Sequence, residues 1–214
     1  MIALRESLIS TAQALSSAGL NTGTAGNLSV RAGAGFLITP SGMPAAAMKP
    51  SDLVWLGFDG SIQGQREPSS EWRLHQDILR GRPEVNAVIH SHAMFATTLA
   101  CLRLEVPAFH YLIAVTGASR IRCAPYTLFG TQAFSDTAVQ ALADSKACLL
   151  ANHGMVVLGA DLNDALRLTI EVETLCERYW RARQLGDPAV LSEAEMAAVF
   201  ERFKTYGQWA GAPD

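Results

Sequence analysis

The sequence predicts an α/β fold in which helices pack on a largely antiparallel or mixed sheet. Segments with helical periodicity alternate with short strand-like runs along the whole chain. Several of these runs follow one another closely enough to pair as local hairpins, which favours antiparallel pairing. The 214 residues contain no repeat, low-complexity tract or linker-like stretch, so we expect one domain over 1–214.

The first half of the chain predicts two helices with strands between them. Apolar residues at helical spacing predict a helix over 4–18, which ends before Gly19. A second helix is predicted over 71–80, where Ser69 and Ser70 stand at the N-cap position. Three strands are predicted between these helices, the first two as a hairpin: 28–30, 36–39 and 53–58.

The second half begins with a predicted strand over 87–92 and an apolar helical stretch over 95–102. Two more strand-like runs, 147–151 and 155–158, are separated by the dipeptide His153-Gly154. Apolar residues that step by three and four positions then form the strongest helical stripe of the chain: Ala165, Leu168, Val172, Leu175 and Tyr179. A last helix is predicted by a capping box of Ser192 and Glu195.

Composition excludes some classes of function. The net charge of −3 and the scattered Lys and Arg residues argue against nucleic-acid binding, which usually requires a basic surface. The apolar runs are too short to span a membrane, and Arg5 and Glu6 interrupt the first one before a signal peptide could form. The four cysteines include no C-x-x-C pair. We therefore expect a cytoplasmic protein with reduced thiols.

Three of the five histidines lie where they could share a metal ion. His90 and His92 are two apart on a predicted strand, so their side chains project from the same face. His153 lies at the break between two strands, before a glycine that permits close backbone approach. Three neutral imidazoles that leave a fourth position open are typical of catalytic zinc. The alternative, that each is an ordinary hydrogen-bonded histidine, stays open on spacing alone; His75 and His110 lie in no comparable setting.

Three segments have the composition of an anion-binding site. They are small, polar and Gly-containing, or stand at a predicted helix N-terminus, where backbone N–H groups are free to bind phosphate: 22–27, 39–42 and 68–71. Ordinary turn and capping chemistry is the favoured interpretation of each segment when it is taken alone. Glu71 is the last residue of the third segment, directly after Ser69 and Ser70, and its simplest interpretation is a carboxylate that stabilises the helix dipole.

Together these segments resemble the class II aldolase/adducin family. The resemblance runs nearly end to end, and its most specific elements are the H-x-H pair, the P-S-S-E run and the N-H-G tripeptide. The segments that carry it are G-T-A-G-N-L-S-V-R (23–31), I-T-P-S-G (38–42), P-S-S-E-W-R-L-H (68–75), A-V-I-H-S-H (87–92), P-A-F-H-Y-L-I-A (107–114), C-A-P-Y-T-L-F-G-T (123–131), N-H-G (152–154) and F-K-T-Y-G (203–207). The resemblance implies an α/β/α sandwich around a mostly antiparallel sheet, assembled as a homotetramer with sites between subunits.

The resemblance also implies roles for individual residues. His90, His92 and His153 would bind one zinc ion per subunit. Glu71 would be a fourth ligand in the empty enzyme and the proton-moving group once substrate displaces it. Tyr111 would act across the subunit interface near the aldehyde oxygen, and Tyr206 would act from the C-terminal tail. The residues implied in holding or shaping the substrate phosphate site are Thr24, Gly26, Asn27, Ser41, Gly42, Ser69 and Ser70.

The implied activity is metal-dependent cleavage of a ketose 1-phosphate to dihydroxyacetone phosphate and an aldehyde. The chain resembles most the members that act on L-fuculose 1-phosphate, whose aldehyde product is L-lactaldehyde. A Schiff-base mechanism is disfavoured, because Lys49, Lys146 and Lys204 lie in none of these motifs. The alternatives are a sibling sugar-phosphate 4-epimerase or sugar-acid-phosphate decarboxylase, and a non-enzymatic interaction domain like that of adducin.

Overall fold

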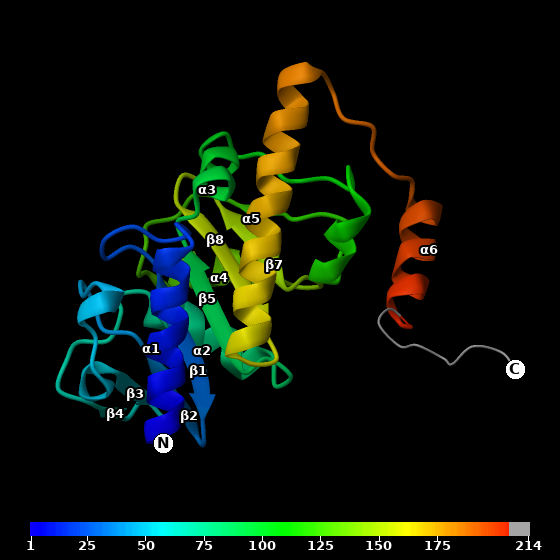
Figure 1. Ribbon diagram of the computed structural model, residues 1–214. Coiled ribbons are helices and arrows are strands. Elements are labelled where there is room, and N and C mark those ends of the chain that lie inside the picture. The colour runs from blue at the N-terminus through cyan, green and yellow to red at the C-terminus, as the bar shows by residue number, and fades with distance from the viewer. Residues whose placement is uncertain (206–214) are drawn as a thin grey trace, which may run out of the picture.

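The computed structural model describes residues 1–205, which fold around a twisted central sheet (Figure 1). Its spatial order is β4-β3-β2-β1-β5-β8-β7-β6. Neighbouring strands pair antiparallel except β6 and β7, which are parallel. The strands are β1 (Asn27–Ala32), β2 (Gly35–Ile38), β3 (Val54–Gly57), β4 (Ile62–Gln63), β5 (Ala87–Ser91), β6 (Cys123–Ala124), β7 (Ala147–Leu150) and β8 (Gly154–Gly159).

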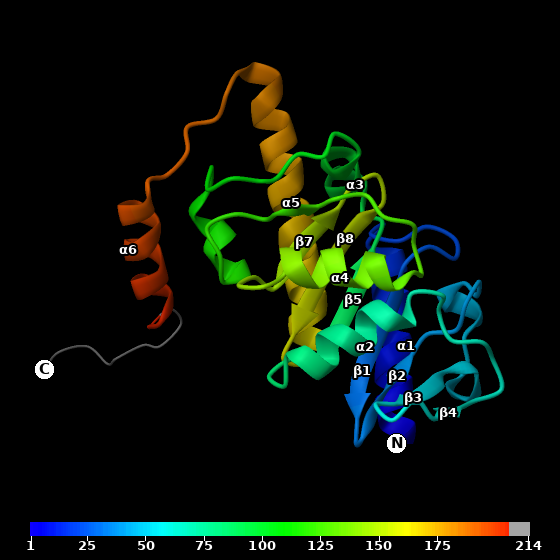
Figure 2. The same cartoon turned by 180° about the vertical axis from the view of Figure 1, so that it is seen from behind.

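Helices cover both faces of the sheet. Figure 1 shows α1 (Ile2–Ser17), α3 (Met94–Cys101) and α5 (Leu162–Leu185) on one face. The view from behind shows α2 (Trp72–Gly81) and α4 (Gln132–Ala141) on the other (Figure 2). The expected α/β/α sandwich with a mostly antiparallel sheet is therefore confirmed.

Side-chain alternation along the central strands builds two apolar cores. On β5, Ile89 faces the core under α1, α3 and α5, while Val88 faces the core under α2 and α4. On β8, Val157 and Val156 divide in the same way. Because both faces are buried, these strands read as continuous apolar runs in the sequence.

The remaining elements lie at the margins of the sandwich. Helix α6 (Glu193–Phe203) begins with the expected capping box of Ser192 and Glu195. It stands away from the sheet in Figure 1, beyond the 3₁₀ helix η3 (Tyr111–Thr116). Two further 3₁₀ turns, η1 (Ala45–Ala47) and η2 (Pro50–Asp52), lie between β2 and β3. Within residues 1–205, no helix is both long and apolar enough to cross a membrane.

The short strands β4 and β6 were not expected, and several elements begin or end a residue or two away from their predicted bounds. Two further differences concern α4 and the start of α2. Helix α4 was not predicted, because its buried side chains are mainly small or polar and make a weak apolar stripe. The expected N-cap at Ser69 or Ser70 is wrong, because Glu71 holds the N-cap position of α2. The Ser69 hydroxyl instead accepts a hydrogen bond from the Glu71 backbone N–H at 3.3 Å.

Candidate active site

Antiparallel pairing brings the three candidate histidines to one edge of the sheet. His90 lies on β5, His92 follows the end of that strand, and His153 lies in the turn between β7 and β8. The end of β5 pairs with the start of β8, through Ser91 and Met155. Residues separated by about 60 positions in the sequence thereby become neighbours across one strand pair.

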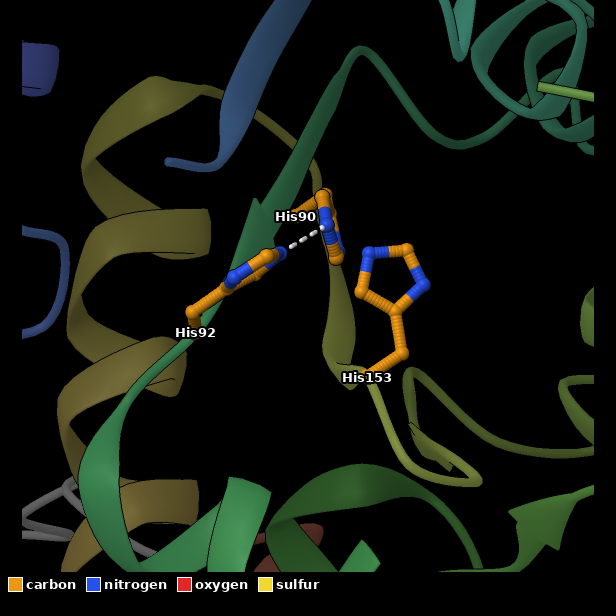
Figure 3. A group of neighbouring side chains, drawn as sticks. All are labelled: His90, His92 and His153. Carbon is orange, nitrogen blue, oxygen red and sulfur yellow. Dashed lines mark hydrogen bonds between the residues drawn. The ribbon is translucent and has the colours of Figure 1, made fainter. Parts of the chain in front are cut away.

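The three imidazoles face one another around a common point (Figure 3). Their ring centroids are 4.7 to 4.9 Å apart. The Nε2 atoms of His90 and His92 are 2.9 Å apart, and the nitrogens of all three rings that could bind one metal ion lie within 4.8 Å of one another. Tetrahedral zinc with Zn–N bonds of about 2.0–2.1 Å requires ligand nitrogens roughly 3.4 Å apart. The cluster is therefore close to the size that one zinc ion needs.

Burial keeps these rings neutral, as metal ligands must be. Desolvation lowers the pKa of His90 to about 3 and that of His153 to about 4. Desolvation also lowers the pKa of His92. The Nδ1 atom of His90 donates to the backbone carbonyl of Met155 at 3.0 Å, because a carbonyl can only accept. In a neutral ring this leaves the lone pair of Nε2 directed at the other two histidines.

Glu71, at the N-cap of α2, adds a carboxylate to the three imidazoles. Its Oε2 atom is 3.3 Å from His90 Nε2, and its Oε1 atom is 3.4 Å from His153 Nε2. Oε1 is buried and has no hydrogen-bond partner in the described part of the chain. A buried carboxylate oxygen beside imidazole lone pairs needs a cation for stability. The residues present therefore fit a divalent metal such as zinc.

All seven residues expected at the phosphate site line one cavity with this cluster. The cavity has a volume of about 250 Å³. Three segments form its walls: the loop before β1, the turn after β2 and the residues just before α2. The side chains of His92, His153 and Glu71 also line it. The expected phosphate residues among the lining are Thr24, Gly26, Asn27, Ser41, Gly42, Ser69 and Ser70. A larger hollow of about 820 Å³ near Asn86 and Asp161 contains none of the expected site residues.

Two of these seven residues already contact Glu71. The Asn27 side-chain amide donates to Glu71 Oε2 at 2.7 Å, and Ser69 accepts from the Glu71 backbone. Both are buried, whereas Ser41 and Ser70 are exposed to the cavity mouth. The exposed hydroxyl residues in the cavity lining are therefore Thr24, Ser41 and Ser70.

The two expected tyrosines lie differently. Tyr111 begins η3, is 49% exposed and does not line the cavity of its own chain. It stacks on Phe203 of α6, with ring centroids 6.3 Å apart. Tyr206 lies outside the described residues.

Other residues at the site were not expected from the sequence. Phe129 lines the cavity although it is 59% exposed, and Phe134 of α4 packs against the ring of His153 at 5.3 Å between centroids. Asn21 links the loop before β1 to the histidine cluster, because its Oδ1 atom accepts a hydrogen bond from the His92 backbone N–H at 3.0 Å. Of these three residues, only Phe129 lies in a segment that carries the family resemblance, 123–131.

Known proteins resemble this chain over nearly its full length. A family model described as class II aldolase and adducin N-terminal domain matches residues 6–180. A 5-methylthioribulose-1-phosphate/5-deoxyribulose-1-phosphate aldolase from Rhodospirillum rubrum is 52% identical over 212 residues, which cover 99% of this chain and 96% of that protein. The L-fuculose phosphate aldolase of Escherichia coli (strain K12) is 43% identical over 205 residues, which cover 95% of each.

Solved structures agree with these relatives. An L-fuculose 1-phosphate aldolase superposes with a TM-score of 0.91 at 39% identity, covering 94% of this chain and 96% of that one. The relatives are enzymes with this fold, so the alternative of a non-enzymatic interaction domain is not supported. The chain therefore belongs to the class II aldolase and adducin N-terminal domain family, and it is an aldolase of that family.

Proposed function

We propose that this enzyme cleaves a ketose 1-phosphate to dihydroxyacetone phosphate and an aldehyde, with one zinc ion per subunit. The observation that carries the proposal is that a cluster of three imidazoles and one carboxylate adjoins a cavity lined by all seven expected phosphate-site residues. A metal site alone would suit many reactions. A metal site beside an anion-binding loop suits a substrate with a phosphate at one end and a carbonyl nearby.

Cleavage breaks the C3–C4 bond and leaves an electron pair on C3. Zinc held by His90, His92 and His153 would supply a Lewis acid that stabilises the negative charge left by cleavage. Glu71 delivers a proton to C3 in the cleavage direction and removes it in the synthetic direction, as a positioned general acid and base. The proton that leaves the C4 hydroxyl passes to Tyr111, which balances the proton added at C3.

The phosphate end of the substrate would be held by hydroxyls and backbone N–H groups. Ser41 and Ser70 are exposed at the cavity, and Ser70 directly precedes the N-cap of α2, where unpaired N–H groups and the helix dipole attract anions. Gly42 adopts a φ of 64°, a conformation that glycine accepts without strain and that lets the backbone approach the ligand. These hydroxyls and N–H groups would bind the dihydroxyacetone phosphate part of the substrate, which every candidate substrate shares.

Two classes of substrate, which differ in the aldehyde that they release, are candidates. L-fuculose 1-phosphate, expected from the sequence, would release L-lactaldehyde, and the relative at 43% identity carries that activity in its name. The relative at 52% identity is named for 5-methylthioribulose 1-phosphate and 5-deoxyribulose 1-phosphate. Cleavage of these pentuloses after C3 would release methylthioacetaldehyde and acetaldehyde. The higher identity favours the pentulose phosphates as the better substrates.

We further propose a homotetramer in the cytoplasm whose sites lie between subunits. Tyr111 is exposed and lies outside its own cavity, as expected for a residue that serves a neighbouring subunit. The four cysteines are free thiols in the described structure, in keeping with a reducing compartment.

The test is a substrate panel with purified, zinc-loaded enzyme. L-fuculose 1-phosphate, 5-methylthioribulose 1-phosphate and 5-deoxyribulose 1-phosphate are compared by kcat/KM, with dihydroxyacetone phosphate followed through a coupled NADH-consuming enzyme. We expect release that a chelator abolishes and that Glu71→Gln lowers about 10²–10⁴-fold. Absence of dihydroxyacetone phosphate from all three substrates would refute the proposed reaction.

A further inference from the structure

A buried line of polar side chains leads from the sheet to Glu71. Ser29 Oγ is 2.7 Å from His75 Nδ1, and His75 Nε2 is 2.5 Å from Asn27 Oδ1. Asn27 Nδ2 is 2.7 Å from Glu71 Oε2. All four residues are buried, and Ser29 and His75 have no exposed surface. The line therefore connects a residue outside the cavity to the carboxylate inside it.

The chemistry of each group sets the direction of these hydrogen bonds. A carboxylate only accepts, so the Asn27 amide nitrogen must face Glu71 and its carbonyl oxygen must face His75. That oxygen also only accepts, so His75 Nε2 carries the proton. Burial lowers the pKa of His75 to about 3, so the ring is neutral and its Nδ1 accepts from the Ser29 hydroxyl. Each group in the line, from Ser29 to Asn27, therefore donates a hydrogen bond to the next group in the direction of Glu71.

The fold explains why these four side chains meet. Asn27 and Ser29 are two apart on β1 and project from the face that α2 covers. His75 lies one turn after Glu71 on that helix, above the same strand. A leucine would fill a buried helix position without needing any hydrogen-bond partner, whereas a histidine there must be satisfied.

We propose that His75 is a positioning residue that orients Glu71 for its proton step, acting through Asn27. His75 fixes the rotation of the Asn27 amide, and the amide then tethers Oε2 of Glu71. The other oxygen, Oε1, has no hydrogen-bond partner in the described chain and stays directed at His153. The inference rests on the proton role proposed above for Glu71. An ordinary core histidine would stabilise α2 but would not affect proton transfer separately from folding.

The experiment isolates the proton step from carbon–carbon cleavage. Zinc-loaded enzyme is incubated with dihydroxyacetone phosphate in D₂O without aldehyde, and NMR follows exchange of the C–H proton that Glu71 removes. His75→Leu removes the donor to Asn27, while His75→Gln keeps an amide N–H near the position of Nε2. Ile78→Ala is the matched control, because Ile78 is buried on the same helix and contacts the apolar core instead.

We expect His75→Leu to slow exchange by about 10-fold to 100-fold, the usual cost of losing a group that orients an active-site residue. Zinc content and the KM for dihydroxyacetone phosphate should stay near those of the parent enzyme, and His75→Gln should restore most of the rate. If His75→Leu exchanges as fast as Ile78→Ala while Glu71→Gln does not exchange, the inference fails and the proposed function stands. If the parent enzyme neither exchanges nor cleaves, both fail.

A second measurement needs neither activity nor a soluble His75→Leu variant. Long-range ¹H–¹⁵N spectra of the ¹⁵N-histidine-labelled parent protein report which ring nitrogen of His75 is protonated. A proton on Nε2 with bare Nδ1 between pH 6 and 8 is the expected result. A proton on Nδ1 would reverse the direction of the line and overturn the inference.

Discussion

Among individual residues, Gly154 holds the two halves of the histidine cluster together. It follows His153 directly and lies against the end of β5. A Cβ atom at this position would lie 2.4 Å from the Ser91 carbonyl oxygen and 3.1 Å from Cδ2 of His92. The neighbour in the first contact is backbone, so it cannot rotate away. A side chain here would therefore separate His92 from His153.

We predict that Gly154→Ala weakens zinc binding about 10-fold or more, a cost typical of displaced ligands. It should also lower the free energy of unfolding by about 1–3 kcal/mol, as overpacking usually does. Competition with a chromophoric chelator measures the zinc affinity. Gly81→Ala is the control, because a Cβ there meets no atom within 4 Å, and it should bind zinc like the parent. Equal affinity in both variants would contradict the prediction.

Among the secondary-structure elements, α2 has both a structural and a chemical role. It begins at Glu71, contributes His75 to the buried line and packs Leu74, Ile78 and Leu79 into the core. Burying a neutral histidine couples the stability of this helix to pH. The folded pKa of His75, about 3, lies below the ordinary value of 6.5. Between these values the unfolded chain binds more protons, so stability falls as pH falls through that window.

For the metal-free protein, we predict that His75 alone removes about 2 kcal/mol of the free energy of unfolding between pH 7 and pH 5. Urea denaturation of the parent and of His75→Gln at both pH values measures this contribution. The variant should lose less stability on acidification, by about that amount. The other histidines titrate in both proteins and cancel in the difference. An equal loss in the two proteins would show that His75 is not buried as a neutral ring.

Helix α3 depends on a carboxylate from another helix. Glu173 on α5 accepts from the backbone N–H groups of Phe95 at 2.7 Å and Ala96 at 2.9 Å. These are first-turn N–H groups with no partner inside their own helix. Because α3 begins two residues after His92, this contact also anchors the segment that follows His92 in the histidine cluster.

We predict that Glu173→Ala lowers the free energy of unfolding by about 1–3 kcal/mol, because two N–H groups lose their acceptor. Thermal or urea denaturation measures the effect. The matched control is Glu177→Ala, one turn later on α5, where the carboxylate forms an i,i+4 ion pair with Arg181. That variant should change stability by no more than about 0.5 kcal/mol. Similar losses in both would argue that Glu173 contributes only a general charge effect.

For the molecule as a whole, the proposed tetramer implies that a neighbouring subunit completes each cavity. The single chain brings together the proposed metal ligands and the proposed phosphate-site residues but leaves Tyr111 exposed at η3. The loop that carries Phe129, which lines the cavity, also has two exposed large side chains, Tyr126 and Leu128. An exposed apolar rim around a site is typical of a surface that a second protein covers.

We predict that two inactive variants complement each other when their subunits are mixed. Glu71→Gln and Tyr111→Phe chains are co-refolded, and cleavage is compared with that of each variant alone. If sites are shared, about a quarter of them recover both intact residues in a random mixture. The species should have about four times the chain mass of 22.9 kDa by light scattering. Recovery of no activity from a mixed oligomer would place Tyr111 and Glu71 in the same subunit's site.

Much of the fold and part of the site follow from local patterns. Backbone alternation directs His90, on β5, and His92, just past the end of that strand, to the same side. Helical periodicity gives α5 its apolar stripe, because neighbours along the chain decide both features. The capping box of Ser192 and Glu195 is local in the same sense. The resemblance to a known family then linked these local patterns into one expected site.

Other features depend on contacts between distant segments. His153 reaches His90 because β8 pairs with β5, and no periodicity within either strand encodes that pairing. No local pattern indicated a role for His75, because its hydrogen-bond partners Asn27 and Ser29 lie on β1, more than 40 positions away. Strand order and helix placement are set by burying apolar area across the entire chain, a global property that local spacing does not carry.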